Sequence, residues 1–371
     1  MSRPLIASSP DSDFADLSTD RPFDLPREPV EEKGEGMPRH LHPLPASLGP
    51  EFSVAQAHRA GVGASRVLAP DLVRPFHGVR MKAIAPTAGD LFDESPRATE
   101  ARVLRAEIRR LARAFSTIAR GGWLFSHTTA AVLWDLPVPI RLLRRGTELI
   151  DVAALGARRA PRGRGVRGRQ LSPELVSVRA HDGFVLASAA SVWAQLGVLL
   201  TIDELVELGD AIVYIPRRHG MERGTSDDAL STREHLEAAL AAGRRAGAAR
   251  LRAALPHVRV GAASPGETRI RRATIAAGLP EPELDYDVVR RDGRPIGFTE
   301  LAHPRFRLLH EYEGDHHRRD RAQWYRDIDK HAACVSEGWE VTRITAAHAY
   351  PDTAPAVRLI RNALVRAGWR P

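Results

Sequence analysis

Acidic side chains and a histidine near the C-terminal end of the chain are the residues best suited to do chemistry. Glu300 lies in one apolar run. Glu311 and Glu313 lie two residues apart in a second run, and His317 follows them. Carboxylate oxygens are the ligands that Mg²⁺ or Mn²⁺ prefers, and an imidazole can accept a proton from an attacking water. These residues predict a metal-dependent hydrolytic site.

Three strands, and a helix before them, are expected to position this cluster. On a strand, side chains two residues apart share one face, so Glu311 and Glu313 point the same way. A hairpin that places Glu300 opposite them would gather the carboxylates at one sheet edge. Converging carboxylates repel one another, so the arrangement is costly without a cation. The expected elements are a helix that begins at Ser264 and strands at 284–289, 296–302 and 306–312.

The charge balance favours a polyanionic partner. The 371 residues carry a formal net charge of +8, and the isoelectric point is about 10.3. Arginine matches phosphate geometry, which favours nucleic acid; the alternative is the arginine bias of a GC-rich genome. Arginines interleaved with glycines at 162–169 form either a phosphate-tracking segment or a solvated charge run. The candidate nucleic-acid-binding residues are Arg162, Arg164, Arg167, Arg169, Arg318 and Arg319.

Other conspicuous residues have simpler interpretations. The single cysteine, Cys334, excludes an intramolecular disulfide and a multi-cysteine zinc site, and is expected to be buried in a helix. His127 begins a helix without a partner motif, so we expect it to be structural. Trp339 is expected in the core. The residues expected to pack or cap a helix, and not to take part in catalysis, are Gln323, Trp324 and Asp327.

Changes in composition divide the chain into segments. Residues 1–50 are rich in Pro, Ser, Asp and Glu, which predicts disorder. Met37 follows six residues with purine-rich codons that resemble a ribosome-binding site, so we expect translation to begin there. Two short helices, the first capped at Ser53, and a strand-like wing predict a winged helix or a small helical cap. The expected segments are 51–82 (winged-helix-like), 83–120 (linker and solvated amphipathic helix), 121–215 (mixed α/β domain), 216–262 (helical connector opening with a polar boundary) and 263–371 (C-terminal domain).

A series of short motifs runs in order through the C-terminal segment. They are Glu267-Thr268-Arg269, Gly278-Leu279-Pro280, Glu300-Leu301-Ala302, Glu311-Tyr312-Glu313-Gly314-Asp315-His316-His317, Gln323-Trp324 with Asp327, and Gly338-Trp339 with Arg343-Ile344-Thr345. Together they resemble the DUF559 family, whose fold is that of the PD-(D/E)XK restriction-endonuclease-like superfamily. The segment is also similar to very-short-patch repair endonucleases.

This resemblance implies a fold, an activity and a site. The fold is α/β (α+β), with a mixed sheet flanked by helices, and the activity is an endodeoxyribonuclease that requires Mg²⁺ or Mn²⁺. Glu300, Glu311 and Glu313 would bind the metal, with Glu313 in the position of the motif lysine. His317 would be the base and Glu267 an assisting carboxylate.

Some positions depart from the family pattern. The family commonly has Asp where this chain has Glu300, and often Asp in place of Glu313, which moves each carboxylate by roughly 1.5 Å. Misplacement by about 1 Å can cost ~100-fold in rate. The motif lysine is absent. An active nuclease and an inactive DNA-binding derivative therefore both stay open.

The upstream half carries a second, shorter resemblance. The segment from Phe52 to Arg80, together with Ser126-His127 and Leu136-Pro137, resembles the AbiEi-type antitoxins of type IV toxin–antitoxin systems. That resemblance implies a winged helix that binds promoter DNA and a cognate toxin as a partner. The long insertion at about 83–120 departs from it.

Three functions remain open at this point: a DNA-binding metal-dependent nuclease, a non-catalytic antitoxin-like transcriptional regulator, and a structural or partner-binding protein. No apolar run reaches the ~20 residues of a membrane span, and the N-terminus lacks the apolar stretch of a signal peptide. We therefore expect a cytoplasmic protein.

Overall fold

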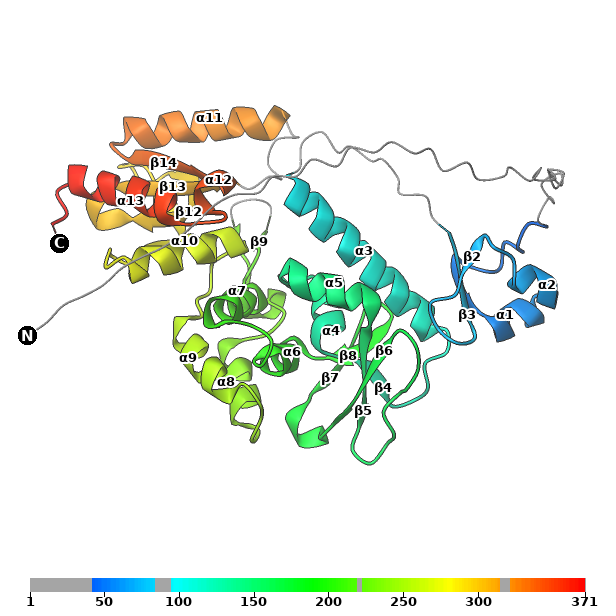
Figure 1. Ribbon diagram of the computed structural model, residues 1–371. Helices are drawn as coiled ribbons and strands as arrows, with labels where there is room; N and C mark the ends of the chain where they lie inside the picture. Colours follow the sequence, from blue (N-terminus) through cyan, green and yellow to red (C-terminus); the bar gives the residue numbers. More distant parts are fainter. Residues whose placement is uncertain (1–41, 84–94, 219–221, 314–320, 371) are drawn as a thin grey trace, which may run out of the picture. The chain divides into compact units, whose positions relative to one another are not determined.

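A computed structural model describes residues 42–83, 95–218, 222–313 and 321–370 (Figure 1). Within these residues, helices are interspersed with sheets of three, five, two and four strands. The two largest sheets each combine parallel and antiparallel pairs. The mixed α/β class predicted from the sequence is confirmed. No described helix has the length and apolar composition needed to cross a membrane.

The first described segment contains two short helices and a small sheet. Ser53 ends strand β1 (Glu51–Ser53) and caps helix α1 (Val54–Arg59). Its hydroxyl accepts a hydrogen bond from the Gln56 amide at 3.2 Å, and Gln56 Oε1 accepts one from the Ser53 amide at 2.7 Å. The single-turn helix α2 (Ala64–Val67) precedes an antiparallel hairpin of β2 (Leu72–Val73) and β3 (Val79–Lys82). The predicted order of two helices and a wing is confirmed.

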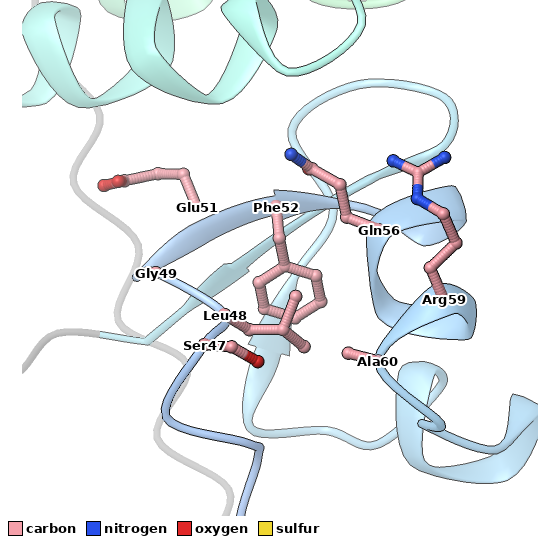
Figure 2. A pocket seen from close by; sticks show the side chains of 8 residues that line it. All are labelled: Ser47, Leu48, Gly49, Glu51, Phe52, Gln56, Arg59 and Ala60. Carbon is pink, nitrogen blue, oxygen red and sulfur yellow. The ribbon is translucent and has the colours of Figure 1, made fainter.

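A pocket of about 330 Å³ lies beside β1 and α1 (Figure 2). Leu48 and Phe52 line it with apolar surface, while Gln56 and Arg59 add polar groups from the helix. Gln56 already serves the helix cap through its side-chain oxygen. None of the site residues predicted from the sequence lines this pocket.

Helix α3 (Pro96–Ser116) is the longest described helix and uses some of its arginines for packing. Arg105 donates to the Leu136 carbonyl at 2.8 Å, and Arg109 donates to the Val132 carbonyl at 2.9 Å. These carbonyls lie at and beyond the C-terminal end of α4 (His127–Leu133), where cations are favoured. The sequence predicts a solvated arginine face here. Two of its arginines instead donate to backbone carbonyls, one in the last turn of α4 and one just beyond it.

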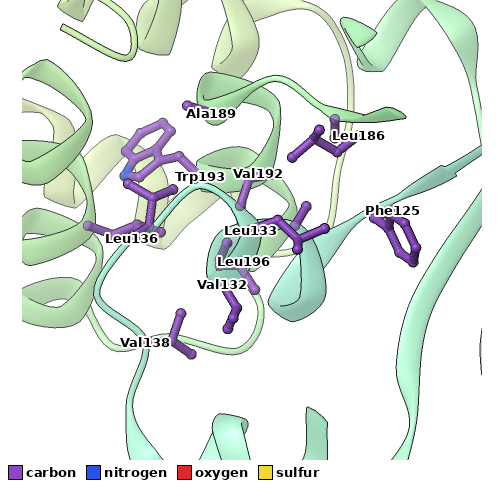
Figure 3. Packing of buried hydrophobic residues seen from close by; sticks show 14 of the residues in the cluster. Phe125, Val132, Leu133, Leu136, Val138, Leu186, Ala189, Val192, Trp193 and Leu196 are labelled. Carbon is purple, nitrogen blue, oxygen red and sulfur yellow. The ribbon is translucent and has the colours of Figure 1, made fainter. Parts of the chain in front are cut away.

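The central domain is built on the five-stranded sheet, in the order β6-β5-β4-β8-β7. Trp193 is fully buried and donates to the Leu205 carbonyl at 2.9 Å. Its side chain belongs to the buried cluster that also contains Leu133, Leu136 and Leu196 (Figure 3). The strands are β4 (Trp123–Phe125), β5 (Ile150–Leu155), β6 (Val166–Leu171), β7 (Val178–His181) and β8 (Phe184–Ala187), with helices α5 (Ile140–Glu148) and α6 (Ala189–Leu196).

The segment expected to be a helical connector is part of the same core. Leu236, Leu251 and Val258 are buried in the cluster that contains Trp193. Thr201 forms a capping box with Glu204: its hydroxyl accepts a hydrogen bond from the Glu204 amide at 3.2 Å. The elements are α7 (Ile202–Val213), β9 (Arg217–Arg218), β10 (Glu222–Arg223), α8 (Arg233–Ala241) and α9 (Ala248–Ala254), with short 3₁₀ helices at Pro173–Leu175, Ser226–Asp228 and Leu255–His257.

The C-terminal domain is a four-stranded sheet with helices on both faces (Figure 1). The strand order is β11-β12-β13-β14, and only the last of these pairs is parallel. Leu301 and Leu308 pack with α10 and α13 on one face, whereas Ala302 and Leu309 pack with Cys334 of α11 on the other. The elements are α10 (Pro265–Ala276), β11 (Glu283–Val289), β12 (Pro295–His303), β13 (Leu308–Glu313), α11 (Arg321–Ser336), β14 (Glu340–Thr345), α12 (Ala346–Ala349) and α13 (Ala354–Arg366).

Several local predictions for this domain are confirmed, and one boundary is wrong. Ser264 caps α10, and Cys334 and Trp339 are buried. Strand β13 begins at Leu308, two residues later than predicted. Residues Pro304–Phe306 form a 3₁₀ turn, and Arg307 has a left-handed φ of 53°, which cannot continue a strand.

Helix α10 is tied to α7 of the central domain by buried polar contacts. Arg271 and Asp210 are both fully buried, and Arg271 Nη2 lies 2.9 Å from Asp210 Oδ2. The Thr268 hydroxyl donates to the same oxygen at 2.9 Å, and the Arg259 amide donates to Asp210 Oδ1 at 2.7 Å. The helix that carries Glu267 is thereby fixed from both sides, by its own sheet and by α7.

Candidate functional site

Glu300 and Glu311 lie at the same end of one strand pair. Strands β12 and β13 pair antiparallel, with Leu301 opposite His310. Glu300 immediately precedes Leu301, and Glu311 immediately follows His310. The two carboxylates, eleven positions apart in the sequence, therefore meet where this ladder ends. The convergence of these two residues, expected from the sequence, is present in the fold.

Glu300 is surrounded by more negative than positive charge. Burial is the main cause that raises the pKa of its carboxyl to about 8, and the charges of Glu267 and Glu311 raise it further. The charge of Lys330 acts in the opposite direction. Glu300 Oε2 is shielded from solvent and has no hydrogen-bond partner among the residues that the structure describes. A buried oxygen of this kind is costly, so the position favours a cationic ligand.

Lys330 of helix α11 brings an ammonium group to this cluster. Its Nζ lies 2.5 Å from Glu311 Oε1 and donates to the Phe298 carbonyl at 2.8 Å. Burial by itself lowers the pKa of Lys330, but the charge of Glu311 and the hydrogen bond to it outweigh burial and raise the pKa. A β-carbon at Gly297 would lie 3.0 Å from the lysine Cδ, so this glycine leaves room for the lysine stem. Lys330 therefore stays protonated beside the carboxylates.

Glu313 has a different partner from Glu311. Its carboxylate forms an ion pair with Arg343 on the adjacent strand β14. The parallel register places Arg343 beside Glu311 and Thr345 beside Glu313. Arg343 thus already compensates the negative charge of Glu313. Glu313 is therefore less suited than Glu300 or Glu311 to bind the predicted metal ion.

Glu267 serves the cap of helix α10. One of its oxygens accepts from the Ala263 amide at 2.8 Å, and the other accepts from the Ser264 hydroxyl at 2.8 Å. Burial raises the pKa of Glu267 to about 7 against the effect of these hydrogen bonds, and the charge of Asp285 adds to the rise. Glu267 therefore influences Glu300 by its charge while its oxygens are engaged in the cap.

Two arginines of the hairpin β9–β10 compensate the aspartates of strand β11. Arg217 Nε lies 2.5 Å from Asp285 Oδ1, and its Nη1 lies 2.7 Å from Asp287 Oδ1. Its guanidinium also stacks 4.3 Å from the centre of the Phe298 ring. Arg223 reaches Asp287 at 3.3 Å. The aspartates of β11 are therefore paired with arginines. Around Glu300, by contrast, negative charge exceeds positive charge.

The described side chains fit a divalent cation in part. No group of three or more histidine, cysteine, aspartate or glutamate side chains within the described ranges is arranged to hold a metal ion. Mg²⁺, however, commonly uses one or two carboxylates and completes its shell with water and phosphate oxygens. The unpartnered Glu300 Oε2, with Glu311 beside it, supplies the oxygen donors that such an ion prefers. Two of the three predicted ligands therefore fit.

Some predicted residues lie outside the described part of the chain. His317, Arg318 and Arg319 fall within residues 314–320, and the side chains of Gln323 and Trp324 are likewise not described. The prediction of His317 as the base thus remains a prediction.

The arginine run at 162–169 divides into two pairs. Arg167 and Arg169 lie on strand β6 and both contact the buried Asp151 of β5, at 3.5 and 3.3 Å. Arg162 and Arg164 are exposed in the preceding loop. Only the strand pair therefore has its guanidinium groups oriented by a carboxylate.

Two residues of the site escaped sequence reasoning. Lys330 was not anticipated because it reaches Glu311 from a helix, and its one sequence signal is that it is the sole lysine on α11. Arg217 lies in the segment predicted to be a polar boundary, and nothing in its neighbours indicates contact with Asp285.

No family model, no curated protein and no solved structure matches this chain.

Proposed function

We propose that the C-terminal domain is a metal-dependent nuclease of the restriction-endonuclease-like class, which hydrolyses phosphodiester bonds in DNA. The mixed sheet with helices on both faces agrees with the architecture that the DUF559 resemblance implies. The observation that carries the proposal is the cluster of Glu300 and Glu311 with an unpartnered buried oxygen and a lysine ammonium at its border.

The residues of this cluster have distinct roles in the proposal. Glu300 and Glu311 hold Mg²⁺ or Mn²⁺, which when bound supplies Lewis-acid stabilisation of the phosphate charge. Lys330 keeps its proton and offers a positive charge to the phosphate oxygens, so it stabilises the developing charge and does not act as a base. It occupies the role of the motif lysine that is missing from the strand. Glu313 is held by Arg343 and is not needed as a ligand.

Cleavage of supercoiled DNA by the purified full chain tests this proposal. The expected result is nicking or linearisation with Mg²⁺ or Mn²⁺ and none with EDTA. Glu311→Gln removes a ligand charge and is expected to abolish cleavage, while Glu313→Gln, the matched change two residues away, is expected to retain it. Equal activity of the wild type and Glu311→Gln would contradict the proposal.

A second function is favoured by one observation, that Glu311 and Glu313 are each already paired with a cation of the protein. A domain with neutralised carboxylates suits a non-catalytic, AbiEi-like antitoxin or transcriptional regulator, with a toxin as partner. DNA retention without metal-dependent cleavage, unchanged in Glu311→Gln, is the result expected for that function.

A further inference from the structure

A second polar cluster lies in the central domain, where α4, β5, β6 and α6 meet. Asp151 is fully buried, and its Oδ1 contacts both Arg169 Nε at 3.3 Å and Arg167 Nη1 at 3.5 Å. His127 at the start of α4 is buried, and the charges of Arg169 and Arg167 help to lower its pKa. The side-chain oxygen of Gln195 accepts a hydrogen bond from the backbone amide of His127 at 2.9 Å. Four elements therefore direct polar groups into one place.

This cluster carries costs that packing does not explain. Within the described residues, Asp151 Oδ2 and Gln195 Nε2 are both shielded from solvent and lack hydrogen-bond partners of good geometry, although the Thr128 amide lies close to the Asp151 carboxylate. His127 has a φ of 48°, a left-handed conformation that is uncommon for residues other than glycine, although His, Asn and Asp adopt it several-fold more often than other side chains. Unsatisfied buried groups and backbone strain together gather at functional sites more often than elsewhere. The cluster therefore has the features of a binding site.

The contacts of Asp151 differ from those of a structural ion pair. In the same chain, Arg66 forms a bidentate ion pair with Asp71 through two hydrogen bonds of 2.8 Å each. Arg167 and Arg169 instead share one oxygen of Asp151, each through a single long contact. Each side chain remains about a third exposed, at 32%. Most of their N–H donors are therefore still available on the surface.

The charges and donors identify the class of ligand. Two guanidinium groups face one carboxylate, and burial lowers the pKa of His127 to about 3, so the imidazole is neutral near pH 7. The cluster thus has net positive charge and an excess of N–H donors, which suits an anion with several acceptor oxygens. Both arginines lie two residues apart on β6, an edge strand that has β5 as its one neighbour in the sheet. An extended polyanion can reach this edge.

We propose that Arg167 and Arg169, held by Asp151 beside His127, form a binding site for a phosphate group of a DNA strand. Asp151 positions the guanidinium groups, and the arginines make the contact. This inference deepens the DNA-binding part of the proposed function. It does not require cleavage, since DNA binding at this site needs neither Glu311 nor a metal ion.

Binding of a short mixed-sequence duplex to the full chain, measured by fluorescence anisotropy in EDTA over a range of salt concentrations, tests the proposal. Arg167→Gln with Arg169→Gln is expected to weaken binding by about tenfold and to reduce the salt slope by about 2. Arg162→Gln with Arg164→Gln removes the same charge from the same run, and is expected to weaken binding less than about threefold. Equal losses in the two double variants would overturn the proposal.

Asp151→Asn gives the sharper test. It makes the chain more positive, so charge alone predicts tighter binding, whereas loss of the orienting carboxylate predicts binding that is weaker by about threefold or more. Tighter or unchanged binding would overturn the proposal. If Asp151→Asn does not fold, Arg167→Lys with Arg169→Lys keeps the charge, loses the planar fork, and is expected to weaken binding.

Two further outcomes separate this inference from its neighbours. Glu311→Gln is expected to bind the duplex as the wild type does, so failure of cleavage leaves this test intact. Inorganic phosphate that raises the melting temperature of the wild type, but not of the Arg167 and Arg169 variant, supports the phosphate chemistry. That same protection with no difference in duplex affinity would overturn the assignment to DNA.

Discussion

At the scale of single residues, Lys330 shows how a charge can be supplied from outside a linear motif. Its ammonium is held between Glu311 and the Phe298 carbonyl, and its pKa is raised by that carboxylate. The lysine therefore remains charged where a phosphate would approach Glu300 and Glu311. In the proposed reaction its contribution is electrostatic, so a variant of Lys330 can be separated from a loss of metal binding.

Lys330→Met keeps the length of the stem and removes the charge. We expect the cleavage rate with Mg²⁺ to fall by about 100-fold, as when one donor to a developing oxyanion is lost. Lys330→Arg is expected to recover part of the rate, since it keeps the charge and changes the geometry. Single-turnover rates measure both, and circular dichroism checks the fold. A Lys330→Met variant as fast as the wild type would remove the lysine from the reaction.

His127 makes a residue-scale prediction about pH. Burial, and then the charges of Arg169 and Arg167, lower its pKa from 6.5 to about 3 in the folded chain. Between these values the unfolded chain binds a proton that the folded chain does not. Stability is therefore lost as the pH falls below 6.5, by up to about 1.4 kcal/mol per pH unit.

His127→Asn removes this titration and tolerates the left-handed backbone. Urea unfolding of the wild type is expected to show a free energy that drops by about 2 kcal/mol more than that of His127→Asn between pH 6.5 and 4.5. Parallel pH profiles for the two proteins would contradict the burial of a neutral imidazole.

At the scale of elements, helix α10 approaches strand β13 through a glycine. A β-carbon at Gly266 would lie 2.3 Å from the ring of Tyr312, which stands between Glu311 and Glu313. Gly266→Ala is expected to destabilise the chain by about 1–3 kcal/mol, because the helix or the ring must move. Gly121→Ala, where no atom lies within 4 Å of the added carbon, is the matched control and is expected to change stability by less than about 0.5 kcal/mol. Urea unfolding at neutral pH compares them.

The same scale shows what the sequence could and could not predict. Helix starts at Ser53, Thr201 and Ser264 follow from local capping chemistry, so they were accessible from the sequence. Strands β11 to β13 follow from alternation, although the left-handed residue Arg307 shifts one boundary. Those signals involve neighbours in the chain.

The site itself was accessible only in part. The pairing of Glu300 with Glu311 could be predicted because the two strands that carry them are adjacent in the sequence and form a hairpin. The approach of Lys330 to Glu311 and of Arg217 to Asp285 depends on how helices and hairpins pack over the sheet. The spacing of residues in the sequence gives no information on such contacts. The pattern of charges likewise did not indicate which carboxylate Lys330 or Arg217 would pair with.

At the scale of the whole molecule, the C-terminal domain depends on the domain before it. Arg271 of α10 is fully buried against Asp210 of α7, and Arg269 and Arg272 of the same helix pair with Glu207 and Asp203. A cut between these helices would expose a charged face that folding currently buries. The described parts of α7 and α10 therefore form one packed unit that joins the two domains.

Asp210→Ala leaves the Arg271 guanidinium buried beside an empty position. We expect a loss of about 3–5 kcal/mol in the free energy of unfolding, measured by urea denaturation. Asp210→Leu with Arg271→Met removes both charges and is expected to recover part of that loss. A single variant that costs less than about 1 kcal/mol would show that the two domains are not coupled through this pair.

The route by which Lys330 reaches Glu311 has a consequence for detecting related proteins. Its stem passes over Gly297, so the position of the positive charge is encoded by a small residue on one strand and a lysine on a later helix. A pattern that demands lysine two positions after the second carboxylate would discard this chain and any homologue built alike. A search that instead requires the pairing of a strand glycine with a helical lysine would retain them.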